Sequence, residues 1–531
     1  MMKRVFFGRK NYEEILEKRV SGLKDNYRQN IAIIGDELSG KTSIVFNFLN
    51  KFQDNRIICL YLDVRPESLN SFAKRFIGVL FYNFLSNSGL ILKEDLGFLL
   101  LKSEKFAPQT VEKAKSILSD LNKRKKKNIF TELNMLCEEL HQETGKSCVV
   151  IFDEFQNLES IGFLNLYREW SKLLITNKNT MYIIISSMKL KTRSILSKNL
   201  SLLFGNFEVI TVEPFDIKSS EEYLRSRLSG INLASPLSNF IVHFTGGCPM
   251  YLEVIADSIL KNKEGALSEI LESLLFDSTG ILNQRFSTFI KSYLDHPHSN
   301  DYISILYLIS SGRNRIKDIS HLLRMQKKDL ITRVSHLLEL DTVTRSGDFL
   351  KINDRVFSFW MKFVYQEKLS SLTFDAKNQK NKFRGSIEGM IQEFILNAQK
   401  PLMERMNELL GSFEDEMVQM ERRRVRLNHF REIKPLEFHS RVLKNGLIGR
   451  SNDSLWLVAV KQDTLSEEDV VEFSRECRRY RHKLQRKIIV TLKDIDTNTR
   501  LRALEEKIWT WDINSLNQML DLYSKPRVIA L

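Results

Sequence analysis

The chain has few cysteines and no long hydrophobic run. Its 531 residues include 5 cysteines, none of them in a C-x-x-C pair, which argues against a disulfide framework and against a zinc knuckle. No run approaches the roughly eighteen apolar residues of a membrane span. The first residues lack the long apolar stretch and the cleavage site of a signal peptide. We therefore expect a cytoplasmic protein with no membrane partner.

Negative charge is scarce relative to positive charge. The chain holds 80 Lys and Arg against 66 Asp and Glu, a net charge of +14. Such an excess favours a polyanionic partner, either nucleic acid or an acidic membrane surface, although it can also be spread over a solvated surface. The apolar share of 43% is ordinary for globular protein. At this length we expect three or four domains.

Glycine is also sparse, so the one glycine-rich motif stands out. Residues 30–47 read NIAIIGDELSGKTSIVFN, an apolar strand, a G-x-x-x-x-G-K-[ST] loop and the start of a helix. In such a loop the backbone N–H groups and the helix N-terminus surround phosphate. Lys41 would reach the β- and γ-phosphates of ATP, and the Thr42 hydroxyl would bind Mg²⁺. The nucleotide-binding residues of the loop would be Gly35, Ser39, Gly40, Lys41, Thr42 and Ser43.

A second motif supplies carboxylates. Residues 148–156, CVVIFDEFQ, describe a buried strand whose carboxyl end carries Asp153 and Glu154, the edge at which parallel α/β sheets bind ligands. Asp153 would hold Mg²⁺, and Glu154 would polarise the attacking water, so we expect ATP to be hydrolysed and not only bound.

Further segments complete an α/β domain over residues 1–215. The run 56–63 suits a strand buried on both faces of a parallel sheet. Strands at 31–34, 148–153, 181–187 and 208–212, four that alternate with helices, predict a parallel, doubly wound sheet. Ser187 or Ser186, at the end of a strand, could sense the γ-phosphate, although such serines are often helix caps. Arg9 is a candidate nucleotide contact, and Arg193 a candidate arginine finger.

A helical lid is expected over residues 216–298. Its turn, Gly246-Gly247-Cys248-Pro249, starts a helix with Pro249 near the first turn. From these residues alone the turn could be an ordinary corner between two helices.

Together these features resemble a known family. Phe7-Gly8-Arg9, the P-loop, Phe152-Asp153-Glu154-Phe155-Gln156, the serine-terminated strand and Gly247-Cys248-Pro249 are similar to archaeal-type P-loop ATPases of the STAND class, relatives of the AAA+ origin-recognition ATPases. The resemblance covers about residues 5–365. It implies a switch with slow turnover, in which Gly247 and Pro249 would contact the nucleotide and couple its state to domain movement.

Residues 299–365 predict a winged helix-turn-helix. Helical patterns at 301–309, 316–323 and 327–338 precede a hairpin with a Ser-Gly-Asp turn at 346–348. This module also resembles the one that follows the ATPase core in the same family. Lys327, Lys328 and Arg333 on the third helix, with Arg345 on the wing, could contact DNA, but such modules also bind proteins. The aromatic segment 357–365 is expected to pack in a core.

Residues 366–385 look like a polar linker, and residues 386–531 resemble the restriction-endonuclease-like fold, family PD-(D/E)xK. The metal site of that family needs an Asp and a Glu-x-Lys on adjacent strands. Lys461 matches the lysine, but Ala459 stands where the glutamate belongs. Glu388 could match the helix acid, while Glu437 and Asp453 are weak substitutes for the missing Asp. We expect a degenerate domain that does not cleave.

Basic residues are dense in this last region, which favours contact with phosphate over a merely solvated face. They are Arg422, Arg423, Arg424, Arg426, Arg431, Arg475, Arg478, Arg479, Arg481, Lys483, Arg486 and Lys487. The sequence thus predicts an ATP-dependent switch that binds DNA, with the ATP state controlling conformation or assembly into a homo-oligomer. The alternative is a signalling or defence ATPase whose C-terminal half binds a protein partner.

Overall fold

The computed structural model describes residues 6–87, 93–123, 128–200, 207–294, 297–370, 375–420, 423–438, 443–452, 454–480 and 483–529. The chain divides into two compact units. The first contains Met1–Pro214 and Glu339–Asp341, and the second contains Phe215–Leu338 and Thr342–Leu531. Within the described ranges, every helix is too short or too polar to cross a bilayer.

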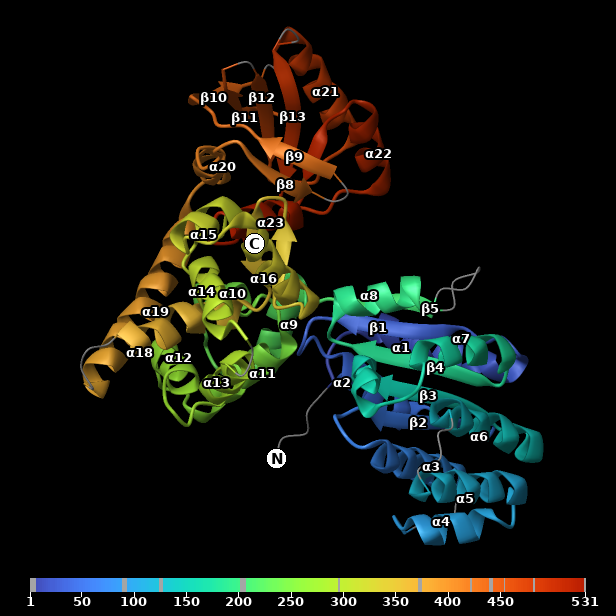
Figure 1. The fold of residues 1–531 in the computed structure, drawn as a ribbon. Coiled ribbons are helices and arrows are strands. Elements are labelled where there is room, and N and C mark those ends of the chain that lie inside the picture. Colours follow the sequence, from blue (N-terminus) through green and yellow to red (C-terminus); the bar gives the residue numbers. More distant parts are fainter. Residues whose placement is uncertain are drawn as a thin grey trace. The chain divides into compact units, whose positions relative to one another are not determined.

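A five-stranded parallel sheet forms the centre of the first unit, in the order β2-β3-β4-β1-β5 (Figure 1). Its strands are β1 (Asn30–Gly35), β2 (Ile57–Asp63), β3 (Ser147–Asp153), β4 (Thr180–Ser186) and β5 (Phe207–Val212). Every residue of β1, β3 and β4 is buried, because helices cover both faces of the sheet. The α/β class is confirmed, and β2 corresponds to the run 56–63 that was expected to form a buried strand.

The helices of this unit are sorted by the alternating side chains of the strands. Apolar residues of α1 and α2 pack with Ile31, Ile33 and Ile183 on one face of the sheet. Those of α3, α5, α6 and α7 pack with Ala32, Tyr182 and Ile184 on the other. The helices are α1 (Lys10–Gly22), α2 (Lys41–Lys51), α3 (Leu69–Ser86), α4 (Leu96–Ser103), α5 (Pro108–Asn122), α6 (Ile129–Thr144), α7 (Leu166–Thr176) and α8 (Lys189–Lys198), with short 3₁₀ turns at Leu23–Asp25 and Phe155–Ile161.

The second unit begins with helices. Five of them are α9 (Ile217–Arg227), α10 (Ser235–Thr245), α11 (Pro249–Lys261), α12 (Leu267–Leu275) and α13 (Ile281–Leu294). Three more, α14 (Ser299–Ser310), α15 (Ile316–Leu322) and α16 (Lys327–Glu339), precede a hairpin of β6 (Val343–Ser346) and β7 (Phe349–Ile352). This is the order of elements expected for a winged helix.

The aromatic segment after the hairpin lies in a core. It forms α17 (Arg355–Trp360), a π-helical turn (Met361–Tyr365) and α18 (Gln366–Ser370). Phe357, Trp360 and Val364 are at most 2% exposed. The expectation that these rings pack instead of stacking on bases is confirmed.

Much of the stretch expected to be a linker is helical. The helix α19 (Ala376–Gln399) starts after Asp375, whose carboxylate accepts from the Asn378 backbone N–H. Lys380 and Arg384 on α19 pair with Glu272 of α12 at 2.8 and 2.9 Å. Two of the polar residues in this stretch are therefore partners of an α12 carboxylate.

A second five-stranded sheet, of order β10-β11-β12-β13-β14, follows. It is antiparallel from β10 to β12 and parallel from β12 to β14. The elements of this region are α20 (Leu402–Leu410), β8 (Glu416–Met420), β9 (Arg423–Leu427), β10 (Glu432–Glu437), β11 (Asn445–Arg450), β12 (Leu455–Lys461), α21 (Glu467–Cys477), a 3₁₀ turn (Arg478–Tyr480), β13 (Leu484–Thr491), α22 (Thr497–Glu505), β14 (Trp509–Trp511) and α23 (Ile513–Leu522).

The strands β8 and β9 form a separate hairpin. The turn of the β6–β7 hairpin packs against it. The Asp348 backbone N–H donates to the Met417 carbonyl at 2.8 Å, and the Met417 N–H donates to the Asp348 carboxylate at 2.8 Å.

Candidate functional site

The loop between β1 and α2 is shaped by its two glycines. Gly40 has a φ of 91°, in the region that favours glycine. A Cβ on Gly35 would lie 2.3 Å from the Val212 carbonyl oxygen of β5, so only glycine fits there. Lys41 folds back over this loop, and its Nζ donates to the carbonyls of Gly35 at 3.1 Å and Asp36 at 2.8 Å.

Lys41 is a buried cation, 4% exposed. Burial lowers the pKa of Lys41, and the nearby carboxylates of Glu154 and Asp153 act against that shift. A cation held in this way, with carbonyl groups as its partners, is available to a more strongly charged acceptor such as phosphate.

Asp153 is the point at which three segments meet. Its Oδ2 accepts from the Thr42 hydroxyl and from the Tyr61 hydroxyl, each at 2.7 Å, and its Oδ1 accepts from the Glu154 N–H at 2.9 Å. Burial raises the pKa of Tyr61, and the bond to Asp153 adds to the shift. The structure thus brings Thr42 and Asp153 together. The contact of Tyr61 with Asp153 could not be predicted from sequence, because it depends on the pairing of β2 with β3.

Glu154 is fixed in place by the neighbouring strand. It adopts a left-handed backbone with a φ of 49°, a strained conformation for a non-glycine residue. Its Oε2 accepts from Gln156 Nε2 at 2.6 Å, from the Ser187 hydroxyl at 2.8 Å and from the Ser187 N–H at 3.2 Å. Ser186 is buried and donates to Gln156 Oε1 at 2.7 Å. Ser187 contacts Glu154 directly, and Ser186 does so through Gln156.

The remaining loop residues differ in their surroundings. The Ser39 hydroxyl is buried and has no hydrogen-bond partner among the described residues, whereas Ser43 is exposed. Asp36 forms an ion pair with Lys189 of α8 at 2.5 Å. No sequence motif indicated a role for Lys189, which lies on a helix far along the chain from the P-loop.

The two arginine candidates lie at the surface of the first unit. The Arg9 guanidinium donates to the Glu213 carbonyl at 2.7 Å and lies over the Tyr12 ring. Arg193 is exposed on α8 and has a long, 3.5 Å contact with the Thr211 hydroxyl. Their proposed nucleotide roles stay predictions.

The residues present fit Mg²⁺. The ion prefers oxygen ligands, and the Thr42 hydroxyl and Asp153 carboxylate already meet. The orphaned Ser39 hydroxyl in the same loop is a further polar group that lacks a partner.

The Gly-x-Pro turn belongs to the second unit. Gly247 has a φ of 80°, and a Cβ there would lie 2.1 Å from the Phe215 carbonyl oxygen. The Phe215 N–H donates to the Gly247 carbonyl at 2.9 Å. Pro249 starts α11. The turn thus secures the first residue of the second unit, and the nucleotide contact of Gly247 and Pro249 stays a prediction.

The four candidate DNA-contacting cations of the α14–β7 module differ in whether they already have a partner within it. Lys327 and Lys328 are exposed. Arg333 forms an ion pair with Asp301 at 3.1 Å, and the Arg345 Nε donates back to the Gly347 carbonyl at 2.9 Å. Two of the four cations are therefore engaged within the module.

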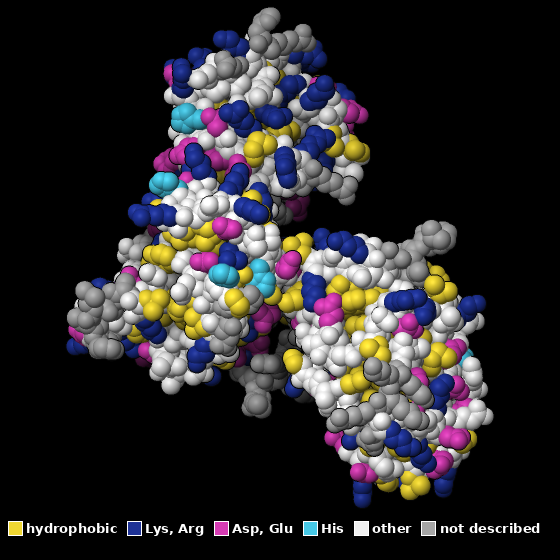
Figure 2. All heavy atoms as spheres, viewed as in Figure 1, with side chains coloured by type: hydrophobic (Ala, Val, Ile, Leu, Met, Phe, Trp, Pro, Cys, Tyr) yellow, Lys and Arg dark blue, Asp and Glu magenta, His cyan; other side chains and the backbone are white. Residues whose placement is uncertain are grey.

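Lys and Arg side chains are frequent on the face of the β8–β14 region seen in Figure 2. Arg423 and Arg424 on β9 are exposed and have no carboxylate partner among the described residues. Arg426 pairs with Asp415 at 3.3 Å. Arg422 and Arg481 lie outside the described residues. Of the others, Arg431, Arg475, Arg478 and Lys483 are exposed, Arg479 pairs with Glu476, Arg486 lies over the Trp509 ring, and Lys487 donates to the Glu506 carbonyl.

The nuclease-like positions are occupied by structural contacts. Lys461 forms an ion pair with Asp469, which also caps α21. Ala459 pairs with Gly446 of β11. Glu388 faces α12, where its carboxylate accepts from the Ser268 hydroxyl at 3.1 Å, and Glu437 is exposed at the end of β10. Asp453 lies outside the described residues.

A family model described as an ATPase domain predominantly from Archaea matches residues 10–255. The amino-terminal half thus contains an archaeal-type ATPase domain. No curated protein matches the chain.

Among solved structures, the Walker-type ATPase of Pyrococcus abyssi is 21% identical, with a TM-score of 0.48, over 68% of this chain and 97% of the other. The ORC2 protein of Aeropyrum pernix, in ADPNP–ADP complexes, is 12% identical, with a TM-score of 0.40, over 70% and 97%. AMPPCP-bound DnaA of Aquifex aeolicus is 12% identical, with a TM-score of 0.29, over 63% and 90%.

Proposed function

We propose that the protein is an ATP-binding and slowly hydrolysing molecular switch that binds DNA through its winged-helix module and basic C-terminal region. ATP would control its conformation or its assembly. The observation that carries the nucleotide part is the junction at Asp153, where the P-loop hydroxyl of Thr42 and the strand β3 meet at 2.7 Å. We also propose that the chain is related to the STAND-class ATPases and to the AAA+ ATPases.

The roles follow from the contacts. The Lys41 ammonium group would give up its hydrogen bonds to the loop carbonyls and bind the phosphates instead. Thr42 and Asp153 would hold Mg²⁺. When bound, Mg²⁺ neutralises charge on the β- and γ-phosphates. Glu154 Oε1 has no hydrogen-bond partner among the described residues, so that atom would orient the attacking water while Ser187 and Gln156 fix Oε2.

The substitutions Glu154→Gln and Lys41→Ala test the nucleotide part. The first should leave ATP affinity within about twofold but reduce turnover at least about 100-fold, since an amide cannot take a proton. The second should abolish ATP binding because the phosphate charge loses its buried cation. Both are measured by calorimetry and phosphate release. Unchanged hydrolysis in both variants would show that the site is misassigned.

Salt dependence tests the DNA part. Binding dominated by phosphate contacts should weaken by orders of magnitude between about 50 and 200 mM salt if several phosphates are neutralised. Mass photometry with and without ATP and duplex DNA would report assembly in the same samples. A flat salt response, or no duplex binding, would refute this part.

We further propose that the C-terminal region retains binding without cleavage, since Lys461 is tied to Asp469 and Ala459 cannot bind a metal ion. Incubation with duplex DNA and Mg²⁺ or Mn²⁺ should leave the DNA intact. Cleavage that disappears in Lys461→Ala would overturn this.

One observation favours the alternative, a regulatory ATPase whose C-terminal half binds a protein. The turn of the β6–β7 hairpin is already covered by β8, so this wing serves an internal protein contact. Salt-insensitive capture of a protein partner, without duplex binding, would support that reading.

A further inference from the structure

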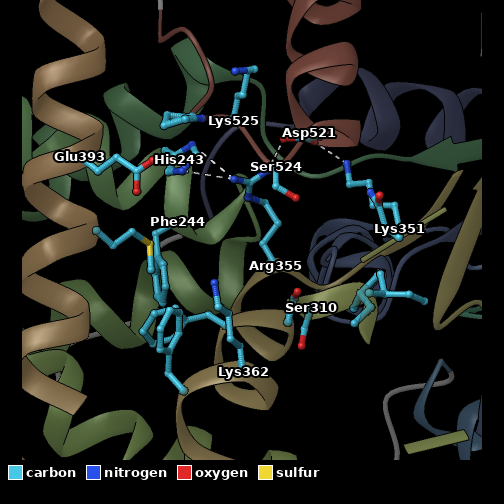
Figure 3. A pocket seen from close by; sticks show the side chains of 18 of the residues that line it. His243, Phe244, Ser310, Lys351, Arg355, Lys362, Glu393, Asp521, Ser524 and Lys525 are labelled. Atoms are coloured by element: carbon cyan, nitrogen blue, oxygen red, sulfur yellow. Dashed lines mark hydrogen bonds and ion pairs between the residues drawn. The ribbon is translucent and has the colours of Figure 1, made fainter. Parts of the chain in front are cut away.

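A cavity of about 430 Å³ lies inside the second unit. It is bounded by α10, α14, the β7–α17 segment, α19 and the chain after α23 (Figure 3). Its volume falls in the range of small-molecule sites, which is about 300 to 1,000 Å³. Its wall is divided between a cationic side and an aromatic side.

The cationic side is built around one buried carboxylate. The Asp521 side chain is 2% exposed and pairs with three cations. Lys351 Nζ lies 2.5 Å from Oδ2, Arg527 Nη2 lies 2.7 Å from Oδ2, and Arg355 pairs with Oδ1. One carboxylate therefore faces three positive charges. Desolvation of unbalanced charge is costly.

One N–H donor of Arg355 lacks a hydrogen-bond partner among the described residues. Its guanidinium reaches between Asp521 and His243, as Figure 3 shows. The Arg355 Nε is buried and has no hydrogen-bond partner among the described residues. Buried donors are rarely left unpaired, because each costs about 1 to 3 kcal/mol.

His243 adds no negative charge that could balance these cations. Its Nδ1 accepts from the Arg527 backbone N–H at 3.3 Å. Burial lowers the pKa of His243, and Arg355 and Arg527 lower it further. Both effects disfavour a fourth positive charge beside Asp521.

Two further lysines complete this side of the cavity. Lys362 and Lys525 line it and have no carboxylate partner among the described residues. Glu393 of α19 is the second lining carboxylate, so Lys351, Arg355, Lys362 and Lys525 face two acidic groups. Figure 3 shows the Lys362 and Glu393 side chains facing the space that Arg355 enters. The cavity retains a surplus of positive charge.

The other side is apolar. Phe244, Phe359, Phe363 and Met390 line it, and the Phe359 and Phe363 ring centroids are 4.7 Å apart. Aromatic surface beside cations suits a ligand that has an anionic end and a planar or apolar end.

We propose that this cavity binds a small organic phosphate whose phosphate meets Arg355, Lys362 and Lys525 and whose apolar portion lies against Phe359 and Phe363. The site is separate from the P-loop and independent of the proposed DNA contacts. It would give the second unit a ligand of its own.

The test uses full-length protein carrying Lys41→Ala, so that the P-loop does not contribute, and titrates AMP and inorganic pyrophosphate by calorimetry. AMP should bind, and Lys362→Ala with Lys525→Ala should weaken it at least tenfold. These two lysines make no ion pairs among the described residues, so the fold should survive. Arg355→Lys, which keeps the charge but removes Nε, should weaken AMP as well.

The matched control is Lys382→Ala, an exposed lysine of α19 that does not line the cavity, and AMP affinity should not change. Phe363→Ala should weaken AMP but not pyrophosphate, because only AMP has a portion that meets the ring. The proposal is overturned if AMP shows no binding up to a few millimolar, or if its affinity is the same in the double-lysine variant. Equal loss of both probes in Phe363→Ala would overturn the assignment of the apolar portion.

Discussion

Three donors converge on one oxygen of Glu154, and Ser187 supplies two of them. Ser187→Ala removes the hydroxyl and leaves the backbone N–H. Because a hydrogen bond to a charged group contributes about 1.5 to 3 kcal/mol, we expect kcat to fall roughly 10- to 100-fold while ATP affinity stays the same. Stopped-flow phosphate release and calorimetry measure the two quantities.

Ser194→Ala, at an α8 serine away from Glu154, is the control and should leave kcat unchanged. If Ser187→Ala instead weakened ATP binding with kcat unaltered, Ser187 would contact the nucleotide itself. The sensor role read from the strand end would then replace the positioning role suggested by the hydrogen bonds.

His243 makes the stability of the second unit depend on pH. Burial lowers the pKa of His243 well below its ordinary value, whereas an unfolded histidine protonates near pH 6.5. Below about pH 6.5 the unfolded chain therefore binds a proton that the folded chain does not. The free energy of unfolding should fall as the pH drops, by up to about 1.4 kcal/mol per pH unit.

His243→Asn should flatten this slope between about pH 7.5 and 5.5, as measured by urea unfolding at each pH. The asparagine side chain can still accept from the Arg527 N–H, which limits the loss of packing. His321→Asn, at an exposed position, should keep the wild-type slope. The explanation fails if the slope survives in His243→Asn.

At the scale of elements, local patterns predicted what is formed by consecutive residues. The P-loop and the acidic end of β3 are each contained in one short segment, so Lys41, Asp153 and Glu154 could be proposed as site residues from sequence. The contacts of Tyr61, Gln156 and Lys189 could not, because they depend on the strand order β2-β3-β4-β1-β5, which is not the order of the chain.

The C-terminal region shows the same limit. The strands β12 and β13 contain apolar runs, which indicate a buried strand directly, whereas β8 to β11 are shorter, and β9 and β10 are rich in charge. On β9, Arg424 and Arg426 are exposed and alternate with Val425 and Leu427, which are buried. That alternation indicates a strand with one exposed face, but the arginine-rich composition of this segment also suits a solvated charged stretch.

The packing of the β6–β7 turn on β8 has its own test. Gly347 has a φ of 63°, and a Cβ there would lie 2.1 Å from the Met417 carbonyl oxygen. Gly347→Ala should therefore lower the free energy of unfolding by about 1 kcal/mol through backbone strain. It should lower it further because the added Cβ pushes the two hairpins apart. We expect a total of about 2 to 4 kcal/mol in urea unfolding.

Gly230→Ala is the matched control, since Gly230 has a φ of 95° and nothing within 4 Å of a built Cβ. Gly230→Ala should lower the free energy of unfolding only by the backbone strain. Equal losses in the two variants would mean that the contact with β8 does not contribute to stability.

At the scale of the whole molecule, net charge is a poor guide to where a polyanion binds. Many cations of the second unit are engaged inside it, since Lys380 and Arg384 pair with Glu272, and Lys351, Arg355 and Arg527 surround Asp521. For the proposed DNA contact, what matters is the set of exposed cations without a carboxylate partner among the described residues. On β9 these are Arg423 and Arg424.

Arg423→Ser with Arg424→Ser should therefore weaken duplex binding and reduce the slope of log affinity against log salt by about 2, because each phosphate contact contributes close to 0.9. The control makes the same change in net charge with Arg500→Ser and Arg502→Ser, whose guanidinium groups already pair with Asp512 at 3.3 Å and Glu505 at 2.8 Å. Its slope should match the wild type, as measured by fluorescence anisotropy at several salt concentrations. If both double variants lowered the slope equally, DNA would respond to net charge alone, and the β9 arginines would not be a specific contact.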